Sequence, residues 1–133
     1  MEIRAGAVLV LIDQQKGIQH PKLGRRNNPQ AEERMQALLG HWRRQGWPVI
    51  HVQHLSHSPE SVFWPEQAGV EFQDAFVPQA GEQLIQKRVP DAFCGTGLET
   101  NLREAGIQQM VLMGVATHNS VEATARTAGN LGF

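Results

Sequence analysis

Three residues with side chains suited to acyl-group chemistry follow apolar runs at widely separated points of the chain. Asp13 follows the run Ala7–Ile12, Lys87 follows Leu84–Gln86, and Ser120 lies in the Gly/Thr/Asn-rich turn after the last apolar run. A serine hydroxyl becomes a nucleophile only when a neighbouring group takes its proton. A carboxylate and an amine that meet this hydroxyl would supply that group, so the three residues form the candidate catalytic set.

The turn before Ser120 has the pattern of a strand–turn–helix elbow. An apolar run from Val111 enters Gly114 and then a polar stretch that ends where a helix should begin. Such an elbow directs backbone N–H groups and the positive end of a helix dipole at a reacting atom. Serine is also a favoured helix N-cap, so a purely structural role for Ser120 stays open.

Hydrophobic periodicity predicts four strands and three helices. The predicted strands are Ala7–Ile12, Pro48–Val52, Leu84–Gln86 and Met110–Met113. The predicted helices run from Asn28 as N-cap, with Pro29 in the first turn, to Gly46; from Thr96 or Gly97 to Gly106; and from Ser120 to about Leu131. The segments 16–28 and 53–81 have no sustained period, and a connection as long as the second is usually a functional loop or lid.

Strands that alternate with helices predict a three-layer α/β/α Rossmann-like sandwich with a mainly parallel sheet. We treat residues 1–133 as a single domain. Because a further strand would naturally follow the last helix, we expect an additional C-terminal portion or a partner over the sheet edge. Ligands of such sheets bind beyond the carboxyl ends of the strands, and there we expect Asp13, Lys87 and Ser120 to converge.

The composition favours a small-molecule partner over nucleic acid or membrane. The net charge is −1 and the 133 residues contain a single cysteine, Cys94. A near-neutral chain offers no electrostatic footprint for nucleic acid or anionic lipid, and a lone cysteine suits a reducing compartment. No apolar run approaches the roughly 20 residues of a spanning helix, so we expect a cytoplasmic protein.

Several other side chains are weaker candidates. His51, His54 and His57 suggest a metal, but residues three apart on a strand point to opposite faces, and we expect none. Cys94 is expected to be a packed small residue, and Arg126 to be solvated or ion-paired. Four aromatic residues of the long loop could wall an apolar pocket or simply hold the loop on the core: Phe63, Trp64, Phe72 and Phe76.

Three stretches, in this order, resemble the isochorismatase-like hydrolase family, which includes nicotinamidases and related cysteine hydrolases. They are IDQQ at 12–15, QKRVPDAFCGT at 86–96 and GVATHNSVEAT at 114–124, and the resemblance extends from about Ala7 to the C-terminus. It implies hydrolysis of a small amide or related molecule without a cofactor, by a protein that forms dimers or larger homo-oligomers.

The resemblance also assigns roles to individual residues. It implies that Asp13 and Lys87 are catalytic, that Ser120 occupies the position of the nucleophilic cysteine, and that the N–H groups of Ala116 and Ser120 form an oxyanion hole. The family often has a cis peptide at the position of Val115–Ala116. The residues expected to bind substrate are Gln53, His54, Phe63, Trp64, His118 and Asn119. In the nicotinamidase branch an Asp and His residues bind metal near this point; here His54 and Ser56 break that pattern.

Serine in place of cysteine leaves three alternatives. Asp13 or a neutral Lys87 could act as the base for Ser120 in acyl transfer. Alternatively, Ser120 is not a nucleophile and Asp13 acts as a general acid on a bond such as a vinyl ether. Finally, the serine could be an engineered replacement of the cysteine. A catalytically inactive homologue that binds a small molecule is the alternative from outside the enzymes.

Overall fold

A parallel four-stranded sheet forms the middle layer of the protein. The computed structural model describes residues 1–133, and its strands are β1 (Val8–Ile12), β2 (Val49–His54), β3 (Gln83–Lys87) and β4 (Met110–Gly114). Their order across the sheet is β3-β2-β1-β4, and every neighbouring pair is parallel. β1 therefore lies between two partners, which explains why all five of its residues are apolar and buried.

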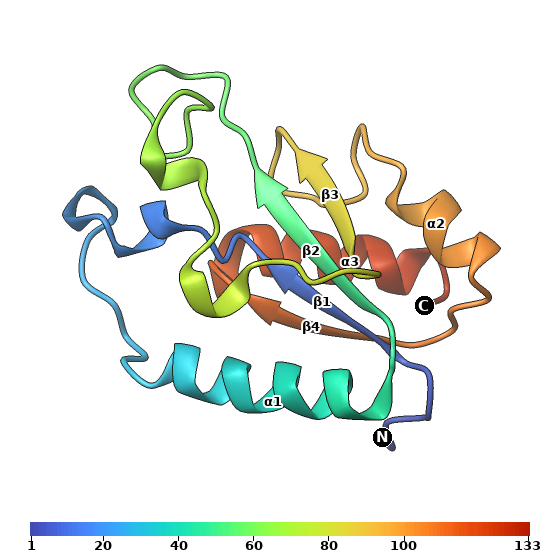
Figure 1. Ribbon diagram of the computed structural model, residues 1–133. Coiled ribbons are helices and arrows are strands. Elements are labelled where there is room, and N and C mark those ends of the chain that lie inside the picture. Colours follow the sequence, from blue (N-terminus) through green and yellow to red (C-terminus); the bar gives the residue numbers. More distant parts are fainter.

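Helices cover both faces of the sheet (Figure 1). α1 (Ala31–Gln45) lies on one face, and α2 (Leu98–Glu104) and α3 (Glu122–Asn130) lie on the other. This is the three-layer α/β/α arrangement with a parallel sheet that the sequence predicts. None of the helices is both long and apolar enough to cross a bilayer.

Alternate residues of the strands divide the apolar core into two clusters, one for each face. Beneath α1, Leu9 and Leu11 pack with Leu39, Trp42 and Phe76. The indole N–H of Trp42 also donates to the buried Ala7 carbonyl at 2.8 Å, which fixes the helix against the start of β1. The opposite cluster joins the other residues of the strands to α2: Val8, Val10, Ile12, Ile50, Val52, Ile85, Ala92, Leu98 and Leu102.

Two of the predicted boundaries that differ from the structure lie at the start of α1 and the end of β2. α1 begins at Ala31 with Gln30 as its N-cap, because Asn28 and Pro29 form a preceding turn in which the Asn28 carbonyl accepts from Ala31 N–H at 3.3 Å. β2 extends to His54 rather than ending at Val52, since its last two residues pair with the end of β3. Gln53 and His54 are polar, so the hydrophobic pattern of the sequence does not indicate this extension.

The long connection between β2 and β3 is anchored to the segment after β1. It contains short 3₁₀ turns at Ala68–Val70 and Asp74–Phe76. The Lys16 N–H donates to the Glu71 carbonyl at 2.8 Å, and the Gln73 N–H donates to the Gln14 carbonyl at 3.0 Å. The connection is therefore an ordered wall beside the carboxyl end of the sheet.

A cluster of charged side chains links α1 to the sheet behind this wall. Glu82 accepts from Arg43 Nε at 2.7 Å through one oxygen and from His51 Nε2 at 2.5 Å through the other. The backbone N–H of Gln79 donates to the same carboxylate at 3.1 Å. Although burial raises the pKa of Glu82, hydrogen bonds from Arg43, Gln79 and His51 outweigh it and lower this pKa to about 2. Burial lowers the pKa of His51.

The lowered pKa of Glu82 makes stability depend on pH on the acid side. The unfolded chain takes up the proton near the ordinary value of 4.5 and the folded chain only near 2, so stability is lost as the pH falls through this interval. We expect Glu82→Gln to lower the urea midpoint at pH 7 and to flatten its decline between pH 4.5 and 2. Circular dichroism during urea titrations at several pH values measures both effects.

The exposed i,i+4 pair Glu99–Arg103 provides the control, because such pairs contribute little to stability. Glu99→Gln should leave both the midpoint at pH 7 and its decline unchanged. Parallel acid profiles for the wild type and Glu82→Gln would contradict the prediction.

Candidate active site

The polar residues gather where the strand order reverses. The chain runs from β1 outward to β2 and β3 and then returns to the other side of β1 as β4. Ligand sites of open parallel sheets lie at such a switch point, beyond the carboxyl ends of the strands. Asp13 follows β1 there with a φ of 55°, a left-handed conformation in which non-glycine residues are uncommon. Its carboxylate is buried, with a side-chain exposure of 8%.

Lys87 and His54 reach this edge from neighbouring strands. They are the last residues of β3 and β2 and are directly paired in the sheet register. Paired residues of parallel strands project to the same face of the sheet, so the two side chains lie together. Lys87 is one of the largest fully buried side chains of the protein.

The Lys87 ammonium group joins the candidate residues. Its Nζ atom lies 3.1 Å from Asp13 Oδ2, 3.3 Å from Ser120 Oγ and 3.1 Å from His54 Nδ1. An ammonium group has three hydrogens and accepts none, so these acceptors use its whole donor capacity. The sequence predicted that Asp13, Lys87 and Ser120 would meet, and the structure brings all three together.

Burial acts on both members of the Asp13–Lys87 ion pair. It raises the pKa of Asp13, which Lys87 and the Ser120 hydroxyl only partly offset. It lowers the pKa of Lys87, against the opposing attraction of Asp13. Desolvation thus moves both groups toward their neutral forms, which makes proton transfer at this site easier than in water. The second carboxylate oxygen of Asp13 is buried without a hydrogen-bond partner, so it can take up a proton or bind a ligand.

The elbow after β4 positions Ser120. β4 ends at Gly114, the peptide bond between Val115 and Ala116 is cis, and a single π-helical turn covers Thr117–Val121 before α3 begins. The predicted helix start at Ser120 is therefore wrong in detail: Ser120 lies inside the π turn, and its hydroxyl faces Lys87 instead of capping a helix. The N–H of Ala116 donates to no group of the protein.

The other residues predicted to bind substrate lie in several environments. His54 contacts Lys87, and the Phe63 ring packs edge-on against the His54 ring at 5.7 Å between centroids. Gln53 points to the opposite face of the sheet, where its amide donates to the Val70 carbonyl at 2.9 Å. Trp64 is half-buried, and His118 and Asn119 are exposed on the π turn. None of these three has a side-chain hydrogen bond to the cluster.

The other side chains singled out in the sequence are either packed in the core or exposed to solvent. Phe76 is fully buried beneath α1, and Phe72 lies edge-on to His51 at 5.8 Å, so both hold the loop on the core. Cys94 was expected to be packed but is exposed, because it lies in the turn region before α2 rather than under it. Arg126 is exposed and pairs with Glu122 one turn earlier. No group of three or more His, Cys, Asp or Glu side chains is placed to hold a metal ion.

Sequence reasoning missed the buried amide of Gln15. Its Nε2 donates to the His54 carbonyl at 2.8 Å and to the Val70 carbonyl at 2.9 Å, and its Oε1 accepts from His54 N–H at 2.8 Å. The side chain thus pairs with the end of β2 as a strand would. Two successive glutamines directly after a buried strand were the available signal, since glutamine is seldom fully buried unless it is hydrogen-bonded.

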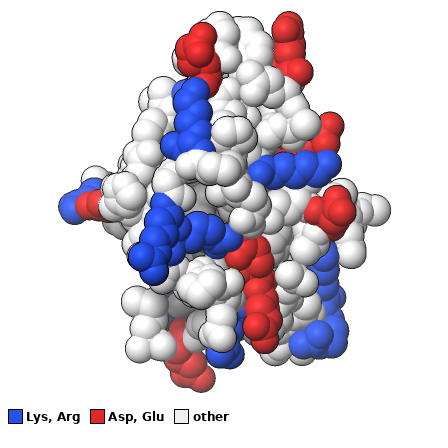
Figure 2. Space-filling view, turned by 90° about the vertical axis from the view of Figure 1, so that its left-hand side faces the viewer, with Lys and Arg blue, Asp and Glu red and all other residues white.

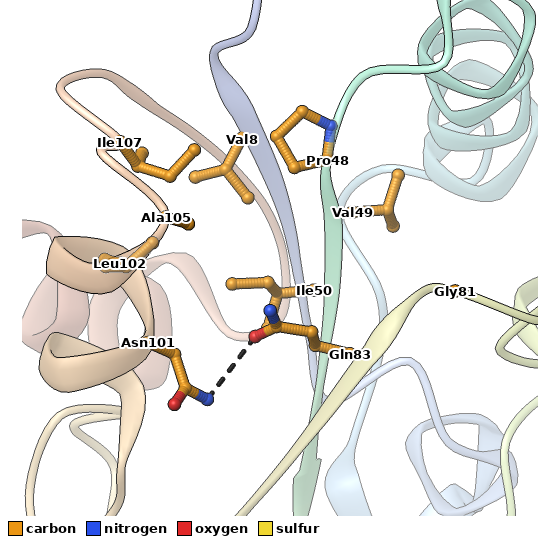
Figure 3. A pocket seen from close by; sticks show the side chains of 10 residues that line it. All are labelled: Val8, Pro48, Val49, Ile50, Gly81, Gln83, Asn101, Leu102, Ala105 and Ile107. Atoms are coloured by element: carbon orange, nitrogen blue, oxygen red, sulfur yellow. Dashed lines mark hydrogen bonds between the residues drawn. The ribbon is translucent and has the colours of Figure 1, made fainter.

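Two other surface features carry no comparable chemistry. A small hollow at the amino ends of the strands is lined by apolar and amide side chains, with no titratable group among them (Figure 3). Figure 2 shows the side of the molecule toward which the carboxyl ends of the strands point, and basic and acidic side chains are interspersed across it. The titratable groups at the switch point are instead the buried Asp13–Lys87 ion pair and its neighbours.

Comparisons with known proteins agree with this geometry. The model of the isochorismatase domain matches residues 7–133. The isochorismatase family protein YrdC of Bacillus subtilis is 40% identical over 125 residues, which are 94% of this chain and 67% of YrdC. A solved isochorismatase-family structure from Chromobacterium violaceum is 47% identical, with a TM-score of 0.92 over 98% of this chain and 67% of that one.

A second similar structure is the N-carbamoylsarcosine amidase of Thermoplasma acidophilum, with 28% identity and a TM-score of 0.80 over 96% of this chain and 78% of that chain. Streptothricin hydrolase of Streptomyces noursei is 35% identical over 100 residues, 75% of this chain and 36% of that enzyme. The chain belongs to the isochorismatase family of hydrolases. It spans about two-thirds of the length of YrdC and of the Chromobacterium violaceum protein.

Gly114 provides a test of how tightly the elbow is built. It has a φ of 140°, and a Cβ atom at this position would lie 2.1 Å from the Ile12 carbonyl oxygen on the paired strand. We expect Gly114→Ala to reduce the free energy of unfolding by about 3 kcal/mol or more, because it adds both strain and overlap with backbone. Urea unfolding followed by fluorescence measures this loss.

Gly129→Ala is the matched control. Gly129 is exposed within α3, has an ordinary φ, and has open space where the Cβ would lie. Alanine is the better helix former by about 0.5–1 kcal/mol, so this variant should be slightly more stable. A Gly114→Ala protein as stable as the wild type would show that the elbow tolerates a shift of β4 against β1.

Proposed function

We propose that this protein hydrolyses a small amide through an acyl-enzyme intermediate formed on Ser120. The observation that carries the proposal is the contact of one buried ammonium group, Lys87, with both the Asp13 carboxylate and the Ser120 hydroxyl. An acid–base group, a cation and a hydroxyl within hydrogen-bond reach are the parts that acyl transfer needs.

In the first half-reaction the Ser120 oxygen attacks the amide carbonyl carbon while Asp13 takes the hydroxyl proton. The carbonyl oxygen becomes an oxyanion, and the N–H groups of Ala116 and Ser120 are proposed to stabilise it. The free N–H of Ala116 supports this role. Asp13 then passes its proton to the nitrogen of the leaving amine as the carbon–nitrogen bond breaks.

In the second half-reaction water attacks the ester. Asp13 takes a proton from the water, the acid product leaves, and the proton returns to the Ser120 oxygen, which restores the starting state. Lys87 stays protonated throughout, where it orients Asp13 and Ser120 and stabilises the negative charge that develops between them. The raised pKa of the buried Asp13 carboxyl suits a group that must both accept and donate a proton near neutral pH.

The similar proteins support an amide substrate. Their names include an N-carbamoylsarcosine amidase, a maleamate amidohydrolase and a ureidoacrylate amidohydrolase. Self-association, a cytoplasmic location and the absence of a cofactor stay predictions.

A second candidate is hydrolysis of a vinyl ether with Asp13 as general acid and no covalent intermediate. The observation that favours it is the unpartnered, buried Oδ1 atom of Asp13, where a proton could reside and be delivered to a substrate. This reaction would not use the Ser120 hydroxyl. The two candidates therefore differ in their response to removal of that hydroxyl.

Three variants assayed on nicotinamide, carbamoyl amides and isochorismate-like ethers test the proposal. We expect Asp13→Asn to lower kcat by about 10²–10⁴-fold, the usual contribution of general acid–base catalysis. Ser120→Ala should abolish amide hydrolysis, and Ser120→Cys should raise it because a thiol ionises more readily beside a cation. Release of ammonia or amine measures amide hydrolysis, and release of the carbonyl product measures hydrolysis of the ethers.

The outcomes separate the candidates. Ether hydrolysis that survives Ser120→Ala but not Asp13→Asn would establish the general-acid reaction instead. Tight binding of a ligand without turnover by either the wild type or Ser120→Cys would identify a binding protein. Glu99→Gln serves as the control and should leave kcat unchanged, because Glu99 lies on α2 and does not contact Asp13, Lys87 or Ser120.

A further inference from the structure

His54 is held in place from three sides. The Gln15 amide bonds both its backbone N–H and its carbonyl at 2.8 Å, and the neighbouring residue Leu55 donates its N–H to the Lys87 carbonyl at 2.8 Å. The Phe63 ring contacts the imidazole edge-on. The backbone of His54 is therefore fixed at the end of β2, and its ring lies against the wall of the long loop.

The contact with Lys87 fixes where the imidazole carries its hydrogen. An ammonium group can only donate, so His54 Nδ1, 3.1 Å from Lys87 Nζ, must present its lone pair. In a neutral imidazole the hydrogen is then on Nε2. Burial and the neighbouring charges of Lys87 and Arg88 lower the pKa of His54 to about 4, so the ring is neutral at physiological pH.

The Nε2–H group is available to a ligand. It has no hydrogen-bond partner within the protein, and the only fully buried side-chain nitrogen and oxygen atoms without partners are Asp13 Oδ1 and His51 Nδ1. His54 Nε2 is therefore accessible from solvent while the opposite nitrogen of the same ring contacts the catalytic ammonium group.

We infer that His54 is a specificity residue whose Nε2–H binds a second oxygen of the substrate, while its Nδ1 positions Lys87. This inference rests on the proposed amide hydrolysis and narrows its substrate class to amides with a further carbonyl or carboxylate oxygen. The positive charges of Lys87 and Arg88 near the ring favour such an oxygen over a cationic or N–H group of the substrate.

Two isosteric variants separate the two nitrogens of the ring. The side-chain oxygen in His54→Asn can replace Nδ1 as acceptor for Lys87 but cannot reach as far as Nε2. The amide nitrogen in His54→Gln can replace Nε2 as donor, but its geometry removes the acceptor near Lys87. The pair therefore tests positioning and substrate binding independently.

Steady-state kinetics on matched amides, with and without the second oxygen, give the readout. We expect His54→Asn to raise KM about tenfold for the amide with the second oxygen, to leave KM unchanged for the amide without it, and to preserve kcat, as for one lost hydrogen bond. His54→Gln should preserve KM and lower kcat for both. Gln86→Ala, on β3 with its side chain on the opposite face, should change neither.

Equal changes in KM and kcat for both variants and both amides would overturn the inference, since the ring would then serve only to pack against Phe63. A purely structural role would also lower the stability of both variants equally without any split between KM and kcat.

A measurement without substrate distinguishes this inference from the proposed function. Long-range ¹H–¹⁵N spectra of the imidazole report which ring nitrogen carries the hydrogen, and we expect Nε2–H with a bare Nδ1 at pH 7. A hydrogen on Nδ1, or a charged ring, would overturn the inference whatever the enzyme hydrolyses. If the expected tautomer is found but Asp13→Asn leaves turnover unchanged, the proposed mechanism fails while the assignment of the two nitrogens stands.

Discussion

The site depends on one ammonium group that is held out of water. Isolated burial of the Lys87 charge would be very unfavourable, and Asp13, Ser120 and His54 together offset this cost by accepting all three of its hydrogens. Each acceptor comes from a different strand end. The positions of β1, β2 and the β4 elbow relative to β3 are therefore linked to a single group of atoms, so a distortion of any of these elements is felt at the reactive centre.

Sheet topology explains why residues so distant in sequence meet. β1 is buried on both faces and is flanked by β2 and β4, which brings the three carboxyl ends to one edge. The helices contribute little to the chemistry directly; they cover the sheet and let its interior strand remain entirely apolar. The charged cluster of Arg43, His51 and Glu82 belongs to this scaffold, because it fixes α1 to the sheet on the face opposite Lys87.

Much of this arrangement could be predicted from the sequence, and the omissions have physical causes. Continuous apolar runs predicted the strands, and strand ends together with the family resemblance predicted the meeting of Asp13, Lys87 and Ser120. The extension of β2 to His54 depends on pairing with β3, which no local pattern records. The buried Gln15 amide was likewise missed, because a side chain that replaces a strand makes its bonds to residues 39 and 55 positions away.

The hydrogen bond of the Gln15 amide to the loop has a consequence for how this loop could be exchanged. The loop wall contacts the Gln15 side chain through a main-chain carbonyl at Val70, and a main-chain carbonyl is present whatever residue occupies the position. The identity of the side chain at position 70 is thus uncoupled from this attachment, to which the packing of Phe72 and Phe76 on the core is added. A grafted loop that keeps this carbonyl together with Phe72 and Phe76 should change which molecules enter the site while the Lys87 ammonium group remains undisturbed.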